Sequence, residues 1–141
     1  MEHVDILVVG GGFAGLRALY TFRNLGKRVV LLEASGGLGG VWYHNGYPGA
    51  RCDVESFDYS YRFSPELEQD WRWSERYATR PEILRYVNHV ADRFDLRKDV
   101  RFNTRMASAV FDEAHSRWTV SSADGRTWSC LLYTSPSPRD S

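Results

Sequence analysis

The chain has 141 residues, and its 18 Lys and Arg balance 18 Asp and Glu, so the formal net charge is zero. This length suits one domain rather than a complete multidomain enzyme, and the charge balance argues against a basic nucleic-acid-binding surface. Apolar residues make up 43% of the chain, as in globular proteins, and their runs are too short to span a bilayer. Two cysteines provide no disulfide scaffold and favour a cytoplasmic location.

The first predicted elements are a strand, a helix and a second strand. Residues 4–9 form a short apolar run that ends in three glycines, which favours a buried parallel strand. A helical pattern follows over residues 14–25, and Gly26 stands where a glycine commonly ends a helix. Residues 28–33, RVVLLE, indicate the second buried strand. Together these elements predict a right-handed βαβ unit.

The turn between the first strand and the helix carries the pattern G-x-G-x-x-G. Gly10 permits the tight turn, Gly12 lets the backbone approach a pyrophosphate, and Gly15 allows close packing of the helix on the strand. Because glycine-rich turns also occur for steric reasons, the pattern alone is weak evidence. Glu33 strengthens it, since a carboxylate at the end of the second strand accepts hydrogen bonds from adenosine ribose hydroxyls and repels the extra phosphate of NADP. The combination predicts a site for FAD or NAD.

The middle of the chain predicts a loop followed by helices. Residues 34–64 contain glycine pairs and a Tyr-Pro-Gly turn, and such a long excursion is typical of a binding loop. A short helix is expected around residues 66–77, and a firmer one with a single apolar face over residues 81–94.

After Asp99 the apolar period changes to two, which predicts an antiparallel meander. Asp124 and Gly125 predict a two-residue hairpin turn between its last strands. The expected strands are 100–103, 107–112, 117–122 and 126 onward.

Two stretches after Glu33 carry a specific resemblance. They are GGVWYHNGYPGARCDVESFDYSYRFS, which starts at Gly39, and WSERYATRPEILRYVNHVADRFDLR, which starts at Trp73. With the glycine turn, they resemble the N-terminal part of the Baeyer–Villiger monooxygenases, flavoproteins that use FAD and NADPH. The resemblance extends over residues 4–128 and implies an α/β fold, namely an incomplete Rossmann-like FAD-binding domain with a βαβ unit and an antiparallel meander. Leu19 is a departure, because many flavoproteins have alanine there.

The resemblance also implies which residues contact the two cofactors. They are Gly10, Gly12, Phe13, Ala14 and Gly15 for the pyrophosphate, Glu33 for the ribose, Val41, Trp42, Tyr43 and His44 along FAD, Tyr59 as a hydrogen-bond partner of FAD, Met106 for backbone contacts to the adenine, and Arg51, Cys52 and Asp53 facing the nicotinamide of NADPH. Asp53 would also act in catalysis, by helping to place an arginine from a later part of the family's chain.

Simpler interpretations stay open for several of these residues. The aromatic side chains equally suit a core, and Asp53 suits a turn cap. His44 and His89 have no Cys or carboxylate at metal-ligand spacing, so no metal site is expected.

The function implied by the resemblance is ketone oxygenation. NADPH reduces FAD, O2 adds at the flavin C4a position, and the resulting peroxide converts a ketone into an ester or a lactone. The expected partners are therefore a small-molecule ketone and O2, with no nucleic acid and no membrane. Another FAD- and NADPH-dependent monooxygenase, of the N-hydroxylating or flavin-containing type, is one alternative. A nucleotide-binding module without catalysis is the other.

The last residues predict an end to the homologous part. We expect residues 1–129 to form the N-terminal part of the FAD-binding domain and residues 130–141 to be a non-native tail. The string CLLYTSPSPRD, which starts at Cys130, resembles a translated sequencing adapter and is expected to break the last strand. A native disordered tail is the alternative. Since the family's second glycine motif and catalytic arginine are absent, the chain alone is not expected to be an oxygenase.

Overall fold

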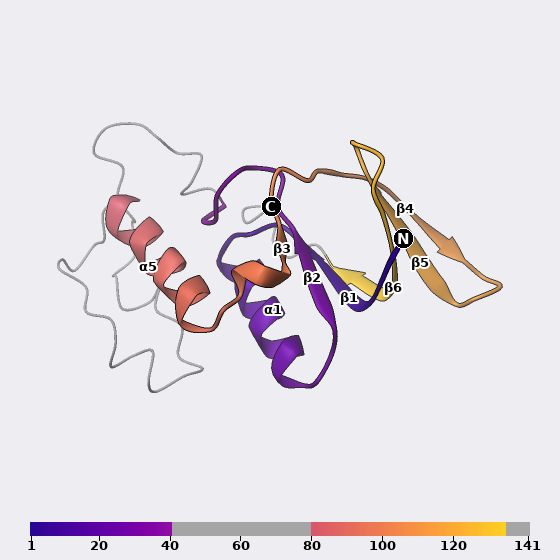
Figure 1. Ribbon diagram of the computed structural model, residues 1–141, viewed down its shortest axis with the longest axis horizontal. Helices are drawn as coiled ribbons and strands as arrows, with labels where there is room; N and C mark the ends of the chain where they lie inside the picture. The colour runs from indigo at the N-terminus through magenta and orange to yellow at the C-terminus, as the bar shows by residue number, and fades with distance from the viewer. Residues whose placement is uncertain (41–79, 135–141) are drawn as a thin grey trace.

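A computed structural model describes residues 1–40 and 80–134 of the chain (Figure 1). The elements within these ranges are β1 (Glu2–Val9), α1 (Phe13–Asn24), β2 (Val29–Leu32), α5 (Arg80–Arg93), the 3-10 helix η1 (Arg97–Asp99), β3 (Val100–Arg101), β4 (Met106–Asp112), β5 (Arg117–Ser122) and β6 (Thr127–Thr134). The helix expected around residues 66–77 lies outside the described residues. None of the described helices has the length and hydropathy needed to cross a membrane.

A six-stranded mixed sheet organises the described residues, in the order β3-β2-β1-β6-β5-β4. β1 pairs in parallel with both β2 and β6, and β2 pairs in parallel with β3. β4, β5 and β6 form an antiparallel meander. The predicted βαβ unit and α/β fold are therefore confirmed. Because β1 and β2 are parallel, their carboxyl ends lie at the same end of the strands, where ligands bind in such folds.

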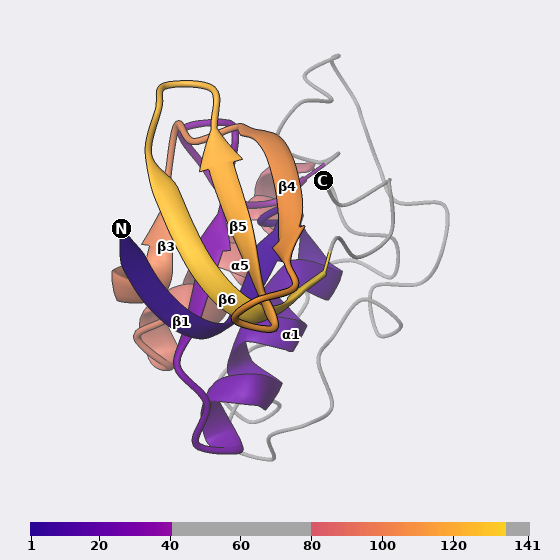
Figure 2. The same cartoon turned by 90° about the vertical axis from the view of Figure 1, so that its right-hand side faces the viewer.

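The two faces of β1 and β2 enter two separate cores. Ile6 and Val8 pack with α1 and α5, whereas Val4 and Leu7 pack with the meander. Figures 1 and 2 show this division, with α1 and α5 on one side of the parallel strands and β4, β5 and β6 on the other. Because successive strand side chains point to opposite faces, burial of both faces explains the unbroken apolar runs at residues 6–9 of β1 and throughout β2.

The helices follow the predicted pattern closely. α1 buries Leu16 and Leu19, so the leucine that departs from the flavoprotein fingerprint fills the core between helix and sheet. Gly26 follows the C-cap with φ of 81°, and its N–H donates to the Arg23 carbonyl at 3.0 Å, as a terminating glycine does. On α5 most of the predicted apolar face is buried, through Ile83, Val87, Val90 and Ala91, whereas Leu84 is only partly buried and Tyr86 joins the core without having been predicted.

The strand that follows η1 does not belong to the meander. The sequence predicted an antiparallel strand over residues 100–103, but β3 covers only Val100–Arg101 and pairs in parallel with β2. Its partners are Leu31 opposite Val100 and Leu32 opposite Arg101. After α5 and η1 the chain enters β3 in the same direction as β2. β3 therefore extends the sheet beside β2 as a parallel strand.

The hairpin between β5 and β6 is also longer than predicted. The Ser122 N–H donates to the Arg126 carbonyl at 2.9 Å, so three residues rather than two lie between the paired positions. Gly125 supplies the left-handed position with φ of 93°. A three-residue loop with glycine at that position is a common alternative to the two-residue turn, and Asp-Gly suits both.

The expected break of the last strand at Cys130 is wrong. β6 continues to Thr134, with Cys130 opposite Val4, Leu132 opposite Ile6 and Thr134 opposite Val8 of β1. Cys130 is fully buried in the meander-side core, and burial raises the pKa of its thiol. β6 therefore covers the edge of β1 with a parallel strand. That residues 130–141 are non-native stays a prediction, although the first of them complete the centre of the sheet.

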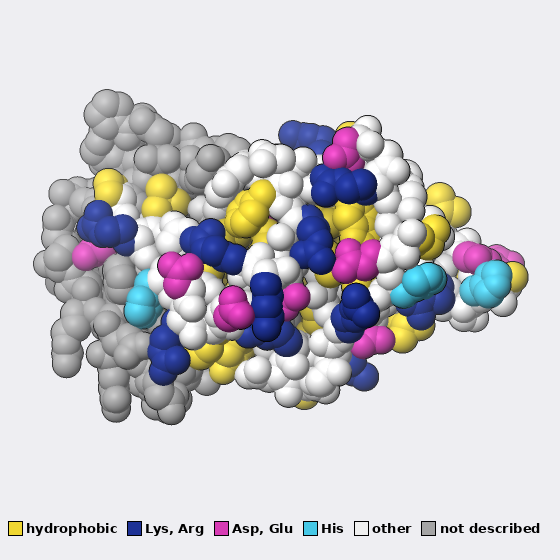
Figure 3. Space-filling view, viewed as in Figure 1, with side chains coloured by type: hydrophobic (Ala, Val, Ile, Leu, Met, Phe, Trp, Pro, Cys, Tyr) yellow, Lys and Arg dark blue, Asp and Glu magenta, His cyan; other side chains and the backbone are white. Residues whose placement is uncertain are grey.

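The surface agrees with the neutral composition. On the face shown in Figure 3, basic and acidic side chains are interspersed over the described residues. Ion pairs among the described residues include Arg23 with Asp99 at 3.4 Å and Arg101 with Glu2 at 3.1 Å.

Candidate dinucleotide-binding site

The glycine turn is tied to both neighbouring elements. Gly10 has φ of 104°, and its N–H donates to the Leu32 carbonyl at 2.8 Å, which joins the turn to the end of β2. A Cβ added to Gly15 would lie 1.9 Å from the Gly10 carbonyl oxygen. Only glycine therefore fits at position 15, and its absence of a side chain allows α1 to start directly against β1.

The N-terminus of α1 is open to an anion. Gly12 is its N-cap and provides no side-chain hydrogen bond, and the first turn contains no acidic residue. The first N–H groups of a helix point along its axis and carry the positive end of its dipole. This end of α1 therefore suits a phosphate group at the turn, with Phe13 and Ala14 half-buried beside it.

The Glu33 side chain is buried next to this turn, with 4% of its surface exposed. Its Oε1 accepts from the Gly11 N–H at 2.7 Å, and its Oε2 accepts from the Ser35 N–H and the Ser35 hydroxyl, both at 2.6 Å. These three donors compensate the carboxylate for the water it has lost. A Cβ on Gly11 would lie 2.9 Å from Oε1. The carboxylate and the glycine turn are thus packed in direct contact.

The chain after Glu33 folds back over the turn. The Gly39 N–H donates to the Gly11 carbonyl at 3.0 Å, and Leu38 is buried in the helix-side core. Gly39 has φ of 125°, a conformation that favours glycine. Residues 33–40 therefore form one wall of the site.

The segment after β3 holds this wall from the other side. The Glu33 N–H donates to the Arg101 carbonyl at 3.0 Å, and the Thr104 N–H donates to the Glu33 carbonyl at 2.9 Å. One residue earlier, the Asn103 N–H donates to the Ser35 carbonyl at 2.9 Å. The backbone on either side of the carboxylate is therefore fixed by hydrogen bonds.

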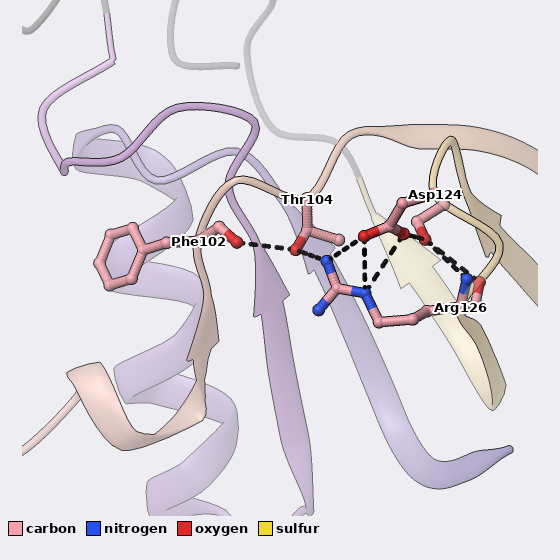
Figure 4. A network of polar contacts seen from close by, with 5 residues as sticks. Phe102, Thr104, Asp124 and Arg126 are labelled. Atoms are coloured by element: carbon pink, nitrogen blue, oxygen red, sulfur yellow. Dashed lines mark hydrogen bonds and ion pairs between the residues drawn. The ribbon is translucent and has the colours of Figure 1, made fainter.

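A polar network connects this segment to the β5–β6 hairpin (Figure 4). The Thr104 hydroxyl donates to the Phe102 carbonyl at 2.9 Å and accepts from Arg126 Nη2 at 2.6 Å. Arg126 also pairs with Asp124 at 2.8 Å. Hydrogen bonds from Arg126, and then from Ser122, lower the pKa of Asp124 to about 2.

Sequence reasoning found part of this arrangement. Ser35, Thr104 and Arg126 were missed. The contacts of Ser35 are local in sequence, because it lies two residues after Glu33. The contact of Arg126 with Thr104 had no local signal, since the two residues are 22 apart in sequence.

The predicted contact residues divide into two groups. The described structure brings together Gly10, Gly12, Phe13, Ala14, Gly15 and Glu33, and places Met106 at the start of β4. The others, which are Val41, Trp42, Tyr43, His44, Arg51, Cys52, Asp53 and Tyr59, lie outside the described residues. That any of them binds a cofactor stays a prediction.

Comparison with known proteins agrees with this geometry. The NAD(P)-binding Rossmann-like domain family matches residues 8–73, which include the glycine turn and Glu33. The structure of an oxidized steroid monooxygenase bound to NADP superposes with a TM-score of 0.92 at 60% identity, over 95% of this chain and 26% of that one. An acetone monooxygenase (methyl acetate-forming) from Gordonia sp. (strain TY-5) is 46% identical over 88% of this chain and 23% of its own length. Methyl acetate is the ester that results when one oxygen atom is inserted next to the carbonyl of acetone, and this insertion is the Baeyer–Villiger reaction.

Over most of its length the chain is similar to a segment of the Baeyer–Villiger monooxygenases and other FAD-dependent monooxygenases. It spans about a quarter of the length of the relatives it matches. A phenazine N-monooxygenase from Lysobacter antibioticus is also similar, at 47% identity over 87% of this chain and 23% of that protein. The segment described above is therefore shared with a protein that is named for oxidation at nitrogen.

Proposed function

We propose that the chain forms the FAD-binding segment of a monooxygenase that uses NADPH and O2 to convert ketones into esters or lactones. The observation that carries the proposal is the buried Glu33 carboxylate in contact with the Gly10–Gly15 turn at the ends of β1 and β2. The ADP part of a dinucleotide requires this pairing of a ribose acceptor with an open helix N-terminus. Similarity to a ketone-oxidising relative supports the reaction type.

The residues present fit FAD better than NADP at this site. Glu33 offers a carboxylate to the ribose, and a negative charge there repels a ribose phosphate. The two Glu33 carboxylate oxygens lie 2.6–2.7 Å from backbone N–H donors. The carboxylate therefore cannot rotate away from the glycine turn without losing those hydrogen bonds. When bound, FAD supplies the redox chemistry that takes electrons from NADPH and delivers them to O2.

The chain's own residues bind and orient that cofactor. The N–H groups at the start of α1, after Gly12, would hold the pyrophosphate, and the backbone at Met106 would contact the adenine. For the loop outside the described residues, the proposal assigns Val41, Trp42, Tyr43, His44 and Tyr59 to FAD, and Arg51, Cys52 and Asp53 to the nicotinamide side. Asp53 would act through its charge, by helping to position a cationic side chain of the whole enzyme. Its partners would be a ketone and O2, in the cytoplasm that the cysteine usage favours.

Oxygenation at nitrogen is the second candidate function. The phenazine N-monooxygenase is as similar to this chain as the acetone monooxygenase is. The site described here serves both reactions equally, because it binds the adenosine end of the cofactor and not the oxidised substrate.

The test uses the whole flavoprotein that contains this chain. Purified protein is assayed for bound FAD and for NADPH oxidation with linear ketones, cyclic ketones and phenazines, and the products are identified by mass spectrometry. FAD with ester or lactone products supports the proposal, and FAD with only N-oxide products supports the second candidate. A protein that takes up no FAD under reconstitution refutes both.

A further inference from the structure

Ser35 competes for the carboxylate that the ribose would use. Its hydroxyl oxygen lies 2.6 Å from Glu33 Oε2 and 2.9 Å from the Gly37 carbonyl oxygen. Both distances are within hydrogen-bond range. A hydroxyl has a single proton, so Ser35 donates to Glu33 or to Gly37, but not fully to both at once.

The acceptor capacity of Glu33 is nearly used up without a ligand. A carboxylate has about four acceptor positions. Donors from Gly11, from the Ser35 backbone and from the Ser35 hydroxyl occupy three of them. One position remains, whereas an adenosine ribose brings two hydroxyl groups.

We propose that the Ser35 hydroxyl occupies one acceptor position of Glu33 in the ligand-free chain and gives it up to a ribose hydroxyl by turning its proton to the Gly37 carbonyl. This inference rests on the proposed function, because it requires that Glu33 bind the adenosine ribose. The change needs only a rotation about the Cβ–Oγ bond of Ser35, which redirects the hydroxyl proton from Glu33 to Gly37. The Ser35 backbone keeps its bonds to Glu33 through its N–H and to Asn103 through its carbonyl.

The exchange makes Ser35 a residue that weakens ribose binding. Its hydroxyl leaves a charged acceptor for a neutral one, and hydrogen bonds to charged groups are about twice as strong as neutral ones. Ribose binding must supply that difference. Ser35 would act only through Glu33, so it is a positioning residue and sets the affinity for the ribose hydroxyls.

The test is a binding comparison on the apoprotein of the whole flavoprotein. Wild type and Ser35→Ala are titrated with FAD and with an FAD analogue whose adenosine ribose lacks both hydroxyls, and dissociation constants are read from flavin fluorescence. Ser35→Ala should bind FAD roughly fivefold more tightly, because the competing donor is gone. The analogue should bind both proteins equally. Ser35→Thr retains the hydroxyl and should behave as wild type.

Each other outcome overturns the inference. Weaker or unchanged FAD binding by Ser35→Ala would show that the hydroxyl supports the carboxylate rather than competing for it. An equal change with FAD and the analogue would indicate a structural effect that does not involve the ribose hydroxyls. If Ser35→Ala does not fold, Ser35→Gly removes the same hydroxyl and is held to the same criterion. Failure of both to fold would make the hydroxyl a structural requirement and also contradict the proposal.

The inference and the proposed function fail in different ways. Wild-type apoprotein that binds no FAD would refute the proposed function. Normal FAD binding with no tighter binding in Ser35→Ala would refute only the role of Ser35.

Discussion

Replacement of Glu33 by glutamine tests the hydrogen bonds that hold the glycine turn. Glutamine has nearly the same shape, but only one of its two terminal atoms is an acceptor. In the structure, Oε1 accepts from the Gly11 N–H and Oε2 accepts from the Ser35 N–H and hydroxyl. The single amide oxygen can face Gly11 or Ser35. In either orientation, one backbone N–H loses its acceptor.

The expected magnitude follows from that count. Glu33 is only 4% exposed, so little water is available to replace the lost acceptor. One buried donor left unpaired costs about 1–3 kcal/mol. The Ser35 hydroxyl limits the loss, because it can accept from the new amide group while it donates to Gly37. The free energy of unfolding of Glu33→Gln should therefore fall by about 1–3 kcal/mol.

The assay is urea unfolding of the chain, followed by tryptophan fluorescence, with and without the substitution. Glu113→Gln is the matched control, since Glu113 is exposed in the turn between β4 and β5, and its stability should change by less than about 0.5 kcal/mol. Hydrogen exchange at Gly11 and Ser35 should accelerate in Glu33→Gln only. An unchanged unfolding free energy at an unchanged denaturant slope would refute the claim that this carboxylate holds the turn.

Three further predictions follow from the turn, the hairpin and the last strand. Gly15→Ala should destabilise the fold strongly in thermal melts, because its Cβ would lie 1.9 Å from the Gly10 carbonyl oxygen; a melting temperature within error of wild type would contradict this. Asp124 has a folded pKa of about 2 against an ordinary 3.8, so its stabilising effect is present above pH 3.8 and is lost as the pH falls through 2. Asp124→Asn should flatten the pH dependence of stability in that window, and a carboxyl NMR titration with a midpoint near 3.8 would count against the Arg126 contact. Deletion of residues 130–141 should abolish cooperative unfolding, because it removes the half of β6 that pairs with residues 4–8 of β1, whereas deletion of residues 135–141 leaves β6 intact and should not.

The sequence alone determined the elements whose causes are local. The first strand, helix and second strand were predictable, because both apolar runs are bounded by glycine or charged residues and Gly26 ends the helix through its own positive φ. The glycine turn and Glu33 were also predictable as a pair, because their relation depends on local spacing along the chain. Their spacing along a βαβ unit leaves one place at which the turn and the end of β2 can meet.

Only the tertiary structure decided how the later strands pair and which residues surround Glu33. An alternating pattern indicates a strand, but it does not specify the partner or the direction of pairing. For this reason β3 was expected in the meander although it lies parallel to β2. The chain after Cys130 was expected to leave the sheet because its sequence resembles an adapter, although it pairs with β1. The contacts of Thr104 with Glu33 and Arg126 likewise join residues that are distant in sequence. Such contacts exist only once the sheet has assembled, so the chain shows no local signal of them.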